Sequence, residues 1–259
     1  SSVVPTVALD QIFRQSATSF IVLNAHRINH GEMPLFDRHS RDFFLFKAKD
    51  AATAADWVVD IVSHRIPERF GLHPVDDVQV LSPMHRGQAG VAALNTRLQA
   101  VLNPPDPGRA EVAVGARVFR VGDKVMQVRN DYRKGVFNGD LGRLVAIDIA
   151  ERRLEVSFEG ARVTYEHHET DELVHAFACS THKSQGAEYP AVVLAILPEH
   201  YMLLQRNLLY TAVTRARRLC VLVGSPRAIA RAVDNDEVAA RNSGLAARLR
   251  SATMQEPHE

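Results

Sequence analysis

Apolar positions follow two different spacings in the first part of the chain. Between residues 51 and 66 they recur three and four apart, which predicts an amphipathic helix. The runs Asp42–Lys47 and Val78–Leu81 are short and largely apolar, which is typical of buried strands. Val91–Leu102 returns to helical spacing and stops before a pair of prolines. Strands that alternate with helices predict a parallel sheet.

The spacing changes between residues 109 and 170. Leu154, Val156 and Phe158 alternate with polar residues, which is the pattern of a half-buried strand. Turn signals that combine glycine with asparagine, aspartate or glutamate separate several such segments. Short strands in close succession predict a small β-barrel here. The predicted strands are Arg117–Val121, Lys124–Val128, Gly142–Ile149, Leu154–Phe158 and Arg162–Tyr165.

The last part of the chain returns to the α/β pattern. Ala191–Leu197 and Leu219–Val223 are nearly continuous apolar runs, as expected of central parallel strands, and Leu203–Arg217 between them reads as a helix. We therefore expect an α/β parallel-sheet domain built from residues 1–108 and 171–250. The barrel of residues 109–170 would be inserted in it, and residues 251–259 would form a tail.

Composition narrows the class of protein. The 259 residues contain 31 Lys and Arg against 30 Asp and Glu, so a chain that is basic throughout is excluded and any nucleic-acid contact must come from a local patch. With two cysteines and no apolar run near the roughly 20 residues that span a bilayer, we expect a cytoplasmic protein without membrane contact. The first residue is not Met, which suggests a piece of a longer chain.

No phosphate cradle of the P-loop type occurs in the sequence. The motif G-x-x-x-x-G-K-[ST] is absent, and Gly122-Asp123-Lys124 is the nearest approach. Cationic and hydroxyl side chains do gather beside apolar strands. Cys179–Pro190 reads CSTHKSQGAEYP, and Arg206–Arg218 reads RNLLYTAVTRARR, in which Arg215 and Arg218 would share a helix face. Two further such segments are LDQIFRQ, which contains Arg14, and SPMHRG after the second predicted strand.

These segments together resemble a known family. THKSQGAE and NLLYTAVTRAR are similar to motifs V and VI of superfamily 1 DNA helicases. LSPMHRG, GDKVMQVRNDY and FNGDLG resemble the RecD-like branch, which includes RecD, its stand-alone bacterial relatives and TraA-type conjugative relaxases. The resemblance runs from about Leu9 to Gly224, and five segments in this order are far more specific than any one alone. It implies the C-terminal half of a motor, a second RecA-like domain with an inserted SH3-like barrel.

The resemblance also implies roles for individual residues. Arg14 and Arg215 match arginines of motifs IV and VI that reach the γ-phosphate of ATP. ATP and Mg²⁺ would be held mainly by an N-terminal RecA-like domain absent from this sequence. The nucleotide-contacting positions would be Arg14, Gln185, Gly186, Glu188 and Arg215. The single-stranded DNA contacts would be Pro83, Met84, His85, Arg86, Gly87, Asn138, Thr181, His182, Lys183 and Ser184.

Two other functions remain open from the residues alone. The chain could be a non-catalytic module whose barrel recruits a protein partner or DNA, or the helicase part of a conjugative relaxase. The helicase hypothesis expects 5′-to-3′ movement, from the resemblance only, and no ATPase activity in the isolated chain. Tyr132, Phe137 and Tyr165 are expected in the barrel core or at its edge rather than as base-stacking platforms, and Cys179 and Cys220 as buried apolar residues. No metal site is expected.

Overall fold

A computed structural model describes residues 19–237 and Arg248. Arg14 and the tail of residues 251–259 lie outside the described residues. The first described helix is α1 (Phe20–Asn29). Its first backbone N–H is satisfied by Asp42, whose Oδ1 lies 3.2 Å from the Phe20 nitrogen. A carboxylate from the next segment therefore holds the start of α1.

The larger sheet is wholly parallel, as the sequence predicts. Its strand order is β1-β12-β11-β2-β10. The two longest apolar runs occupy central positions because their residues are buried on both faces. Its strands are β1 (Phe43–Lys47), β2 (Val78–Ser82), β10 (Ala178–Ser180), β11 (Tyr189–Ile196) and β12 (Ala216–Gly224).

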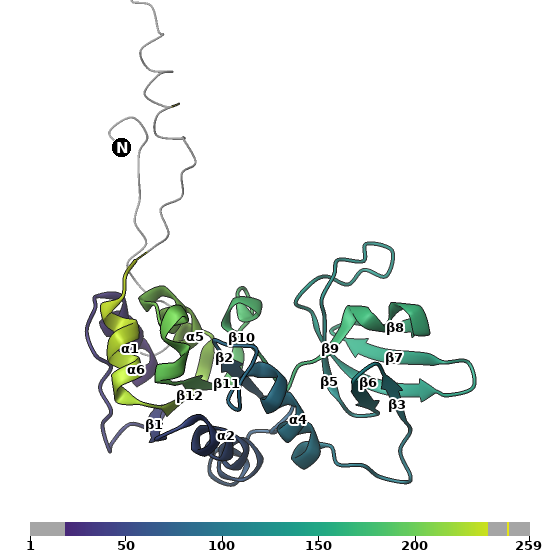
Figure 1. The fold of residues 1–259 in the computed structure, drawn as a ribbon, viewed down its shortest axis with the longest axis horizontal. Coiled ribbons are helices and arrows are strands. Elements are labelled where there is room, and N and C mark those ends of the chain that lie inside the picture. The colour runs from purple at the N-terminus through teal and green to yellow at the C-terminus, as the bar shows by residue number, and fades with distance from the viewer. Residues whose placement is uncertain (1–18, 238–247, 249–259) are drawn as a thin grey trace, which may run out of the picture.

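Helices cover both faces of this sheet (Figure 1). Alternate residues of β11 divide between two cores: Val192, Leu194 and Ile196 face one, and Val193 and Ala195 face the other. The first core is completed by α1, α5 (Arg206–Thr214) and α6 (Pro226–Asp234), and the second by α2 (Ala51–Asp60) and α4 (Val91–Leu102). This three-layer arrangement confirms the α/β fold class.

The helix predicted after the first strand is longer than its apolar pattern. Asp50 caps α2 by accepting a hydrogen bond from the Thr53 backbone nitrogen at 2.8 Å. The helical path continues through a π-helical turn, Ile61–Arg65, into α3 (Ile66–Phe70). Gly71 ends it with φ of 64°, a left-handed conformation that favours glycine.

The middle segment forms a smaller, antiparallel domain. One sheet has the order β8-β7-β6-β5-β9, and β3 pairs with β4 alone, so the described residues form two sheets around one core rather than one closed barrel. All five predicted strands are present; β3 and β9 were not predicted. β9 lies beyond residue 170, and the boundaries of the insert stay a prediction. The strands are β3 (Glu111–Val114), β4 (Arg117–Arg120), β5 (Lys124–Gln127), β6 (Leu141–Asp148), β7 (Arg153–Phe158), β8 (Ala161–Glu166) and β9 (Leu173–His175).

The helix predicted over residues 203–217 is shorter. A 3₁₀ segment, Pro198–Leu203, precedes α5, and the chain is already extended at Ala216, which opens β12. Arg215 and Arg218 therefore do not share a helix face, contrary to the prediction. Pairing of β12 with strands on both sides outweighs the local preference for a helix.

The aromatic and thiol predictions have mixed outcomes. Tyr165 is fully buried in the small-domain core, but Tyr132 and Phe137 are exposed on a loop, so of the two expected positions, core or edge, the core is wrong for them. Val136, between them, takes the buried position instead. Cys179 and Cys220 are buried and free, as expected, and burial raises the pKa of the Cys179 thiol to about 12.

Candidate functional site

Arg215 stands at the C-terminal end of α5, immediately before β12. Its guanidinium donates to the Ala187 carbonyl oxygen at 2.9 Å and to the Thr211 carbonyl oxygen at 3.2 Å. A third contact, at 3.4 Å, joins it to the Thr214 hydroxyl. All these acceptors are neutral, and no carboxylate of the described residues pairs with this arginine. Its charge is therefore fixed in place without being cancelled, which suits it to bind an anion.

Three other predicted nucleotide residues lie next to the Ala187 carbonyl. Gly186 has φ of 87°, and a side chain there would meet no atom within 4 Å, so this turn requires glycine for its backbone and leaves open space above it. Gln185 is exposed at the end of a 3₁₀ turn. Glu188 accepts a hydrogen bond from Arg217 at 2.8 Å, so this carboxylate already has a cationic partner.

The predicted DNA segment of motif V forms the 3₁₀ turn Thr181–Ser184, called η3. His182 and Lys183 are exposed, whereas Thr181 and Ser184 are buried. The Ser184 hydroxyl donates to the Thr181 carbonyl oxygen at 2.7 Å, but the Thr181 Oγ1 is buried with no hydrogen-bond partner among the described residues. The turn therefore presents one cation and one imidazole to solvent.

The second predicted DNA segment, residues 83–87, follows β2 at the same edge of the sheet from which η3 follows β10. Ser82 pairs in register with Ser180, so the two segments leave adjacent strand ends. The loop is fixed by the start of α4, because the Val91 nitrogen donates to the Met84 carbonyl at 2.9 Å and the Ala92 nitrogen to the His85 carbonyl at 3.1 Å. His85, Arg86 and Gly87 are exposed, while Pro83 is buried.

The remaining predicted positions are apart from these two segments. Asn138 is exposed on the loop between β5 and β6, and its backbone nitrogen donates to the Asn130 side-chain oxygen at 2.9 Å. Arg14 lies outside the described residues. The site residues therefore fall into an arginine centre, two segments at one sheet edge and a separate small-domain loop.

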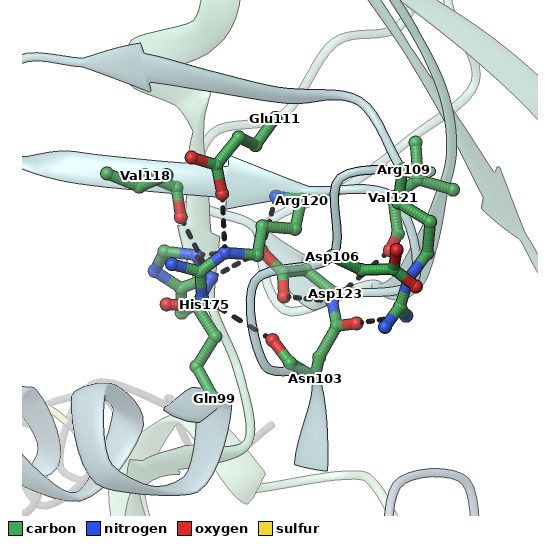
Figure 2. Close-up of polar contacts among 10 residues, drawn as sticks. All are labelled: Gln99, Asn103, Asp106, Arg109, Glu111, Val118, Arg120, Val121, Asp123 and His175. Carbon is green, nitrogen blue, oxygen red and sulfur yellow. Dashed lines mark hydrogen bonds and ion pairs between the residues drawn. The ribbon is translucent and has the colours of Figure 1, made fainter. Parts of the chain in front are cut away.

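A buried carboxylate that the sequence reasoning did not assign joins the two domains. Asp123 is wholly inaccessible to solvent and accepts hydrogen bonds from Gln99 at 2.7 Å, Asn103 at 2.8 Å and the Arg120 nitrogen at 2.8 Å. His175 contacts the same carboxylate at 3.2 Å. Figure 2 shows these side chains converging on Asp123 from α4, from β4 and from the end of β9. In the sequence, the only sign of this site was the string Gly122-Asp123-Lys124, which was noted as the nearest approach to a P-loop motif.

The neighbouring Lys124 reinforces this junction. Its ammonium group is buried and donates to the Val78 carbonyl oxygen of β2 at 3.0 Å, which ties β5 of the small domain to the larger sheet. Burial lowers the pKa of Lys124 to about 8. Asp123 and Lys124 therefore form a structural joint between the two domains.

Within residues 19–237 and Arg248, no group of three or more His, Cys, Asp or Glu side chains is arranged to hold a metal ion. Over the same part of the chain, no helix is long and apolar enough to cross a bilayer.

Two family models match the chain. Residues 94–158 match the model described as the ATP-dependent RecD-like DNA helicase SH3 domain. Residues 175–223 match the UvrD-like helicase C-terminal domain. The first covers α4 and most of the antiparallel domain, and the second covers η3, α5 and most of β12. The SH3 match therefore falls mainly on the antiparallel domain, and the UvrD-like match falls on the last strands of the larger sheet and on α5.

Curated relatives agree with these models. The chain is 35% identical over 249 residues to the ATP-dependent RecD2 DNA helicase of Deinococcus radiodurans, which covers 95% of this chain and 32% of that protein. It is 32% identical over 188 residues to the RecBCD enzyme subunit RecD of Mycolicibacterium smegmatis, covering 71% of this chain and 31% of that subunit. The chain thus spans about a third of the length of these relatives.

A solved structure supports the fold. The Pif1 helicase from Bacteroides, in complex with ADP-AlF₃ and single-stranded DNA, superposes with a TM-score of 0.50 at 16% identity, over 95% of this chain and 56% of that one. The two family models and the RecD relatives assign the chain to the C-terminal region of superfamily 1 helicases. Within that superfamily, the SH3 model and the RecD relatives assign the chain to the RecD-like branch.

Proposed function

We propose that this chain is the C-terminal half of an ATP-dependent DNA helicase and that Arg215 is its arginine finger. The observation that carries the proposal is the setting of Arg215, held by backbone and hydroxyl oxygens and unpaired with any carboxylate of the described chain. An arginine that serves only to stabilise a fold commonly pairs with an acid, as Arg217 does with Glu188. Arg215 instead keeps its full charge for a ligand.

The chemistry asks for such a group. Transfer of the γ-phosphoryl group of ATP to water develops charge on its equatorial oxygens, and a guanidinium fork stabilises that charge. ATP and Mg²⁺ would be held mainly by an N-terminal RecA-like domain of the same protein. Gly186 leaves open space beside its own turn, and Gln185 and Glu188 of the same turn would contact the nucleotide there. Arg14 is proposed as a second cation on the γ-phosphate.

The DNA contacts belong to the same proposal. His85 and Arg86 on one loop, and His182 and Lys183 on η3, expose donors at neighbouring strand ends. Such a strip contacts phosphates without reading bases, as a translocating motor requires. ATP binding would close this domain on its N-terminal partner, and hydrolysis would reopen it, so that the grip on single-stranded DNA alternates. Movement from 5′ to 3′ and a protein partner for the small domain are part of the proposal.

Names of relatives support this activity. The Deinococcus radiodurans relative is named an ATP-dependent DNA helicase, and the Bacteroides structure contains a nucleotide complex and single-stranded DNA. Both properties belong to those proteins, and the proposal extends them to this one.

The test measures ATP hydrolysis with and without a P-loop domain. The isolated chain is expected to show no turnover, because it has no phosphate cradle. Joined to the N-terminal RecA-like domain, Arg215→Ala is expected to lower the DNA-stimulated kcat about 1,000-fold with little change in KM. Arg218→Ala is the matched control, since Arg218 is exposed on the adjacent strand and should behave as wild type. Turnover by the isolated chain, or an Arg215→Ala enzyme as active as the control, would refute the proposal.

A further inference from the structure

The loop of residues 128–140, between β5 and β6, is built rigidly around Asp131. The Asp131 Oδ1 accepts hydrogen bonds from the backbone nitrogens of Arg133 at 2.9 Å and Lys134 at 3.1 Å. The backbone amide of Lys134 is the main reason that the pKa of this carboxyl lies below its ordinary value. Asp131 also forms an isolated antiparallel bridge with Val136, which is buried in the small-domain core. The tip between them is therefore a closed turn.

A second set of bonds fixes the returning side of the loop. The Phe137 nitrogen donates to the Asp140 side chain at 2.8 Å, and the Asn138 nitrogen donates to the Asn130 side chain at 2.9 Å. The rings on this loop thus have a defined position, because the backbone that carries them is hydrogen-bonded on both sides.

Two aromatic rings are held in solvent by this frame. The exposed fraction of Tyr132 is 79% and that of Phe137 is 44%. Their centroids are 5.7 Å apart with an interplanar angle of 76°, an edge-to-face pair. Neither ring contributes to the core, although several hydrogen bonds hold the turn that carries them. Exposed aromatic surface on a rigid frame is typical of a binding site.

One basic side chain beside the rings is available to solvent. The loop of residues 128–140 has three basic and two acidic side chains, and Arg129 pairs with Asp171 at 3.3 Å. The Arg133 side chain is 88% exposed, and its contact with Asp131 is long, at 3.9 Å. Lys134, by contrast, is held against the domain by Glu169 at 2.6 Å. Arg133 is thus the cation beside Tyr132 that is available to a ligand in solvent.

The loop lies on the same side of the molecule as η3. In Figure 1 it projects upward from the small domain, and the turn after β10 projects upward from the larger sheet. A strand that crosses the turn after β10 and continues over the small domain would pass on the side from which the 128–140 loop projects. Rings, an adjacent exposed cation and this placement match the requirements for binding unpaired nucleobases, whose faces stack on aromatic side chains.

We propose that Tyr132 and Phe137 form a stacking site for the bases of single-stranded DNA and that Arg133 contacts the adjacent phosphate. This inference rests on the proposed function, because it assumes that the chain binds single-stranded DNA. It adds a base-contacting site on the inserted domain to the phosphate-contacting strip of the larger domain.

The test compares binding of two fluorescein-labelled 16-nucleotide strands, oligothymidylate and an abasic strand with the same backbone. By fluorescence anisotropy at fixed salt, Tyr132→Ala is expected to bind oligothymidylate about tenfold more weakly, which corresponds to about 1.4 kcal/mol. Tyr132→Phe keeps a ring and is expected to retain wild-type affinity. Both variants should bind the abasic strand as the wild type does, since no base is present to stack. Folding is checked by circular dichroism.

A second readout detects the contact directly. Light-induced crosslinking to a strand containing 5-iodouracil should map by mass spectrometry to the peptide with Tyr132 or Phe137. Equal affinity of Tyr132→Ala and wild type for oligothymidylate, with crosslinks elsewhere, overturns the stacking site, and the exposed pair is then better explained as a protein-docking surface. No binding of either strand by the wild-type chain overturns the single-strand grip itself, so the two failures are distinguishable.

Discussion

Removal of the Asp123 carboxylate is the most direct test of how the two domains are joined. Asp123→Ala deletes the acceptor for Gln99, for Asn103 and for the Arg120 backbone nitrogen, all within 2.8 Å. The two amides keep other acceptors, since Gln99 also donates to the Val118 carbonyl and Asn103 to the Val121 carbonyl. The part-buried Arg120 backbone nitrogen would lose this acceptor.

The magnitude follows from these three bonds. A hydrogen bond to a charged acceptor contributes about 1.5–3 kcal/mol, and the retained acceptors place the two amides at the low end of that range. Relief of the buried carboxylate's desolvation offsets part of the loss. We therefore expect Asp123→Ala to lower the free energy of unfolding by about 4 kcal/mol. Asp123→Asn keeps one acceptor oxygen and opposes its NH₂ group to one donor, so it should cost about half as much.

The assay is urea unfolding followed by circular dichroism, with hydrogen exchange of the Arg120 and Leu144 amides as probes within the small domain. Asp106→Ala is the matched control. Asp106 lies in the connection from α4 to β3 and pairs with Arg109, but it is exposed, so its loss should leave the free energy of unfolding nearly unchanged. An Asp123→Ala variant within about 0.5 kcal/mol of this control would refute the conclusion that the carboxylate holds the junction.

Two further predictions concern a buried histidine and a crowded glycine. Burial lowers the pKa of His200 to about 4, so the unfolded chain binds the extra proton first and stability falls as the pH drops from about 6.5 to about 4. His200→Asn keeps an acceptor for the Leu197 nitrogen but does not titrate. Between these two pH values the free energy of unfolding of the wild type should fall by up to about 3 kcal/mol relative to this variant. Parallel pH profiles of the two proteins in urea unfolding would contradict this prediction. A Cβ at Gly90 would lie 2.2 Å from the Arg86 carbonyl oxygen, so Gly90→Ala should lower the free energy of unfolding by about 1–3 kcal/mol. It should also weaken oligothymidylate binding, because the 83–87 loop must shift. Unchanged affinity would show that this loop does not contact the DNA.

Local pattern was sufficient where one element buries one face. Val91–Leu102 was predicted with the bounds that α4 has, because its apolar face and the following prolines mark both ends. The two central strands were predicted from continuous apolar runs, because both of their faces are buried. β9 was missed because it has only three residues and is held by pairing with β5, far away in sequence. Short strands of this kind depend on partners that a local pattern does not reveal.

The site shows the same division between local and long-range causes. Motif strings identified Arg215 and the segments at the sheet edge, and the structure adds which side chains of those strings reach solvent. Tyr132 and Phe137 were expected in the barrel core or at its edge because aromatic side chains usually bury most of their surface. The bonds of Asp131 and Asp140 turn both rings outward, and polar side chains that bond to a nearby backbone are hard to distinguish from solvated ones in a sequence.

The joint at Asp123 has a mechanical consequence for the proposed DNA grip. Gln99 and Asn103 lie at the end of α4 and its C-cap, and the start of the same helix is bonded to the 83–87 loop. Lys124, next along the chain, bonds to β2, the strand that leads into that loop. The small domain is thus attached both to the helix that follows the loop and to the strand that precedes it. A helix of 12 residues without proline bends little, so we expect the 128–140 loop and the 83–87 loop to move as one body during a translocation step. Loosening Asp123 would then lower translocation per ATP hydrolysed more than it lowers ATP hydrolysis.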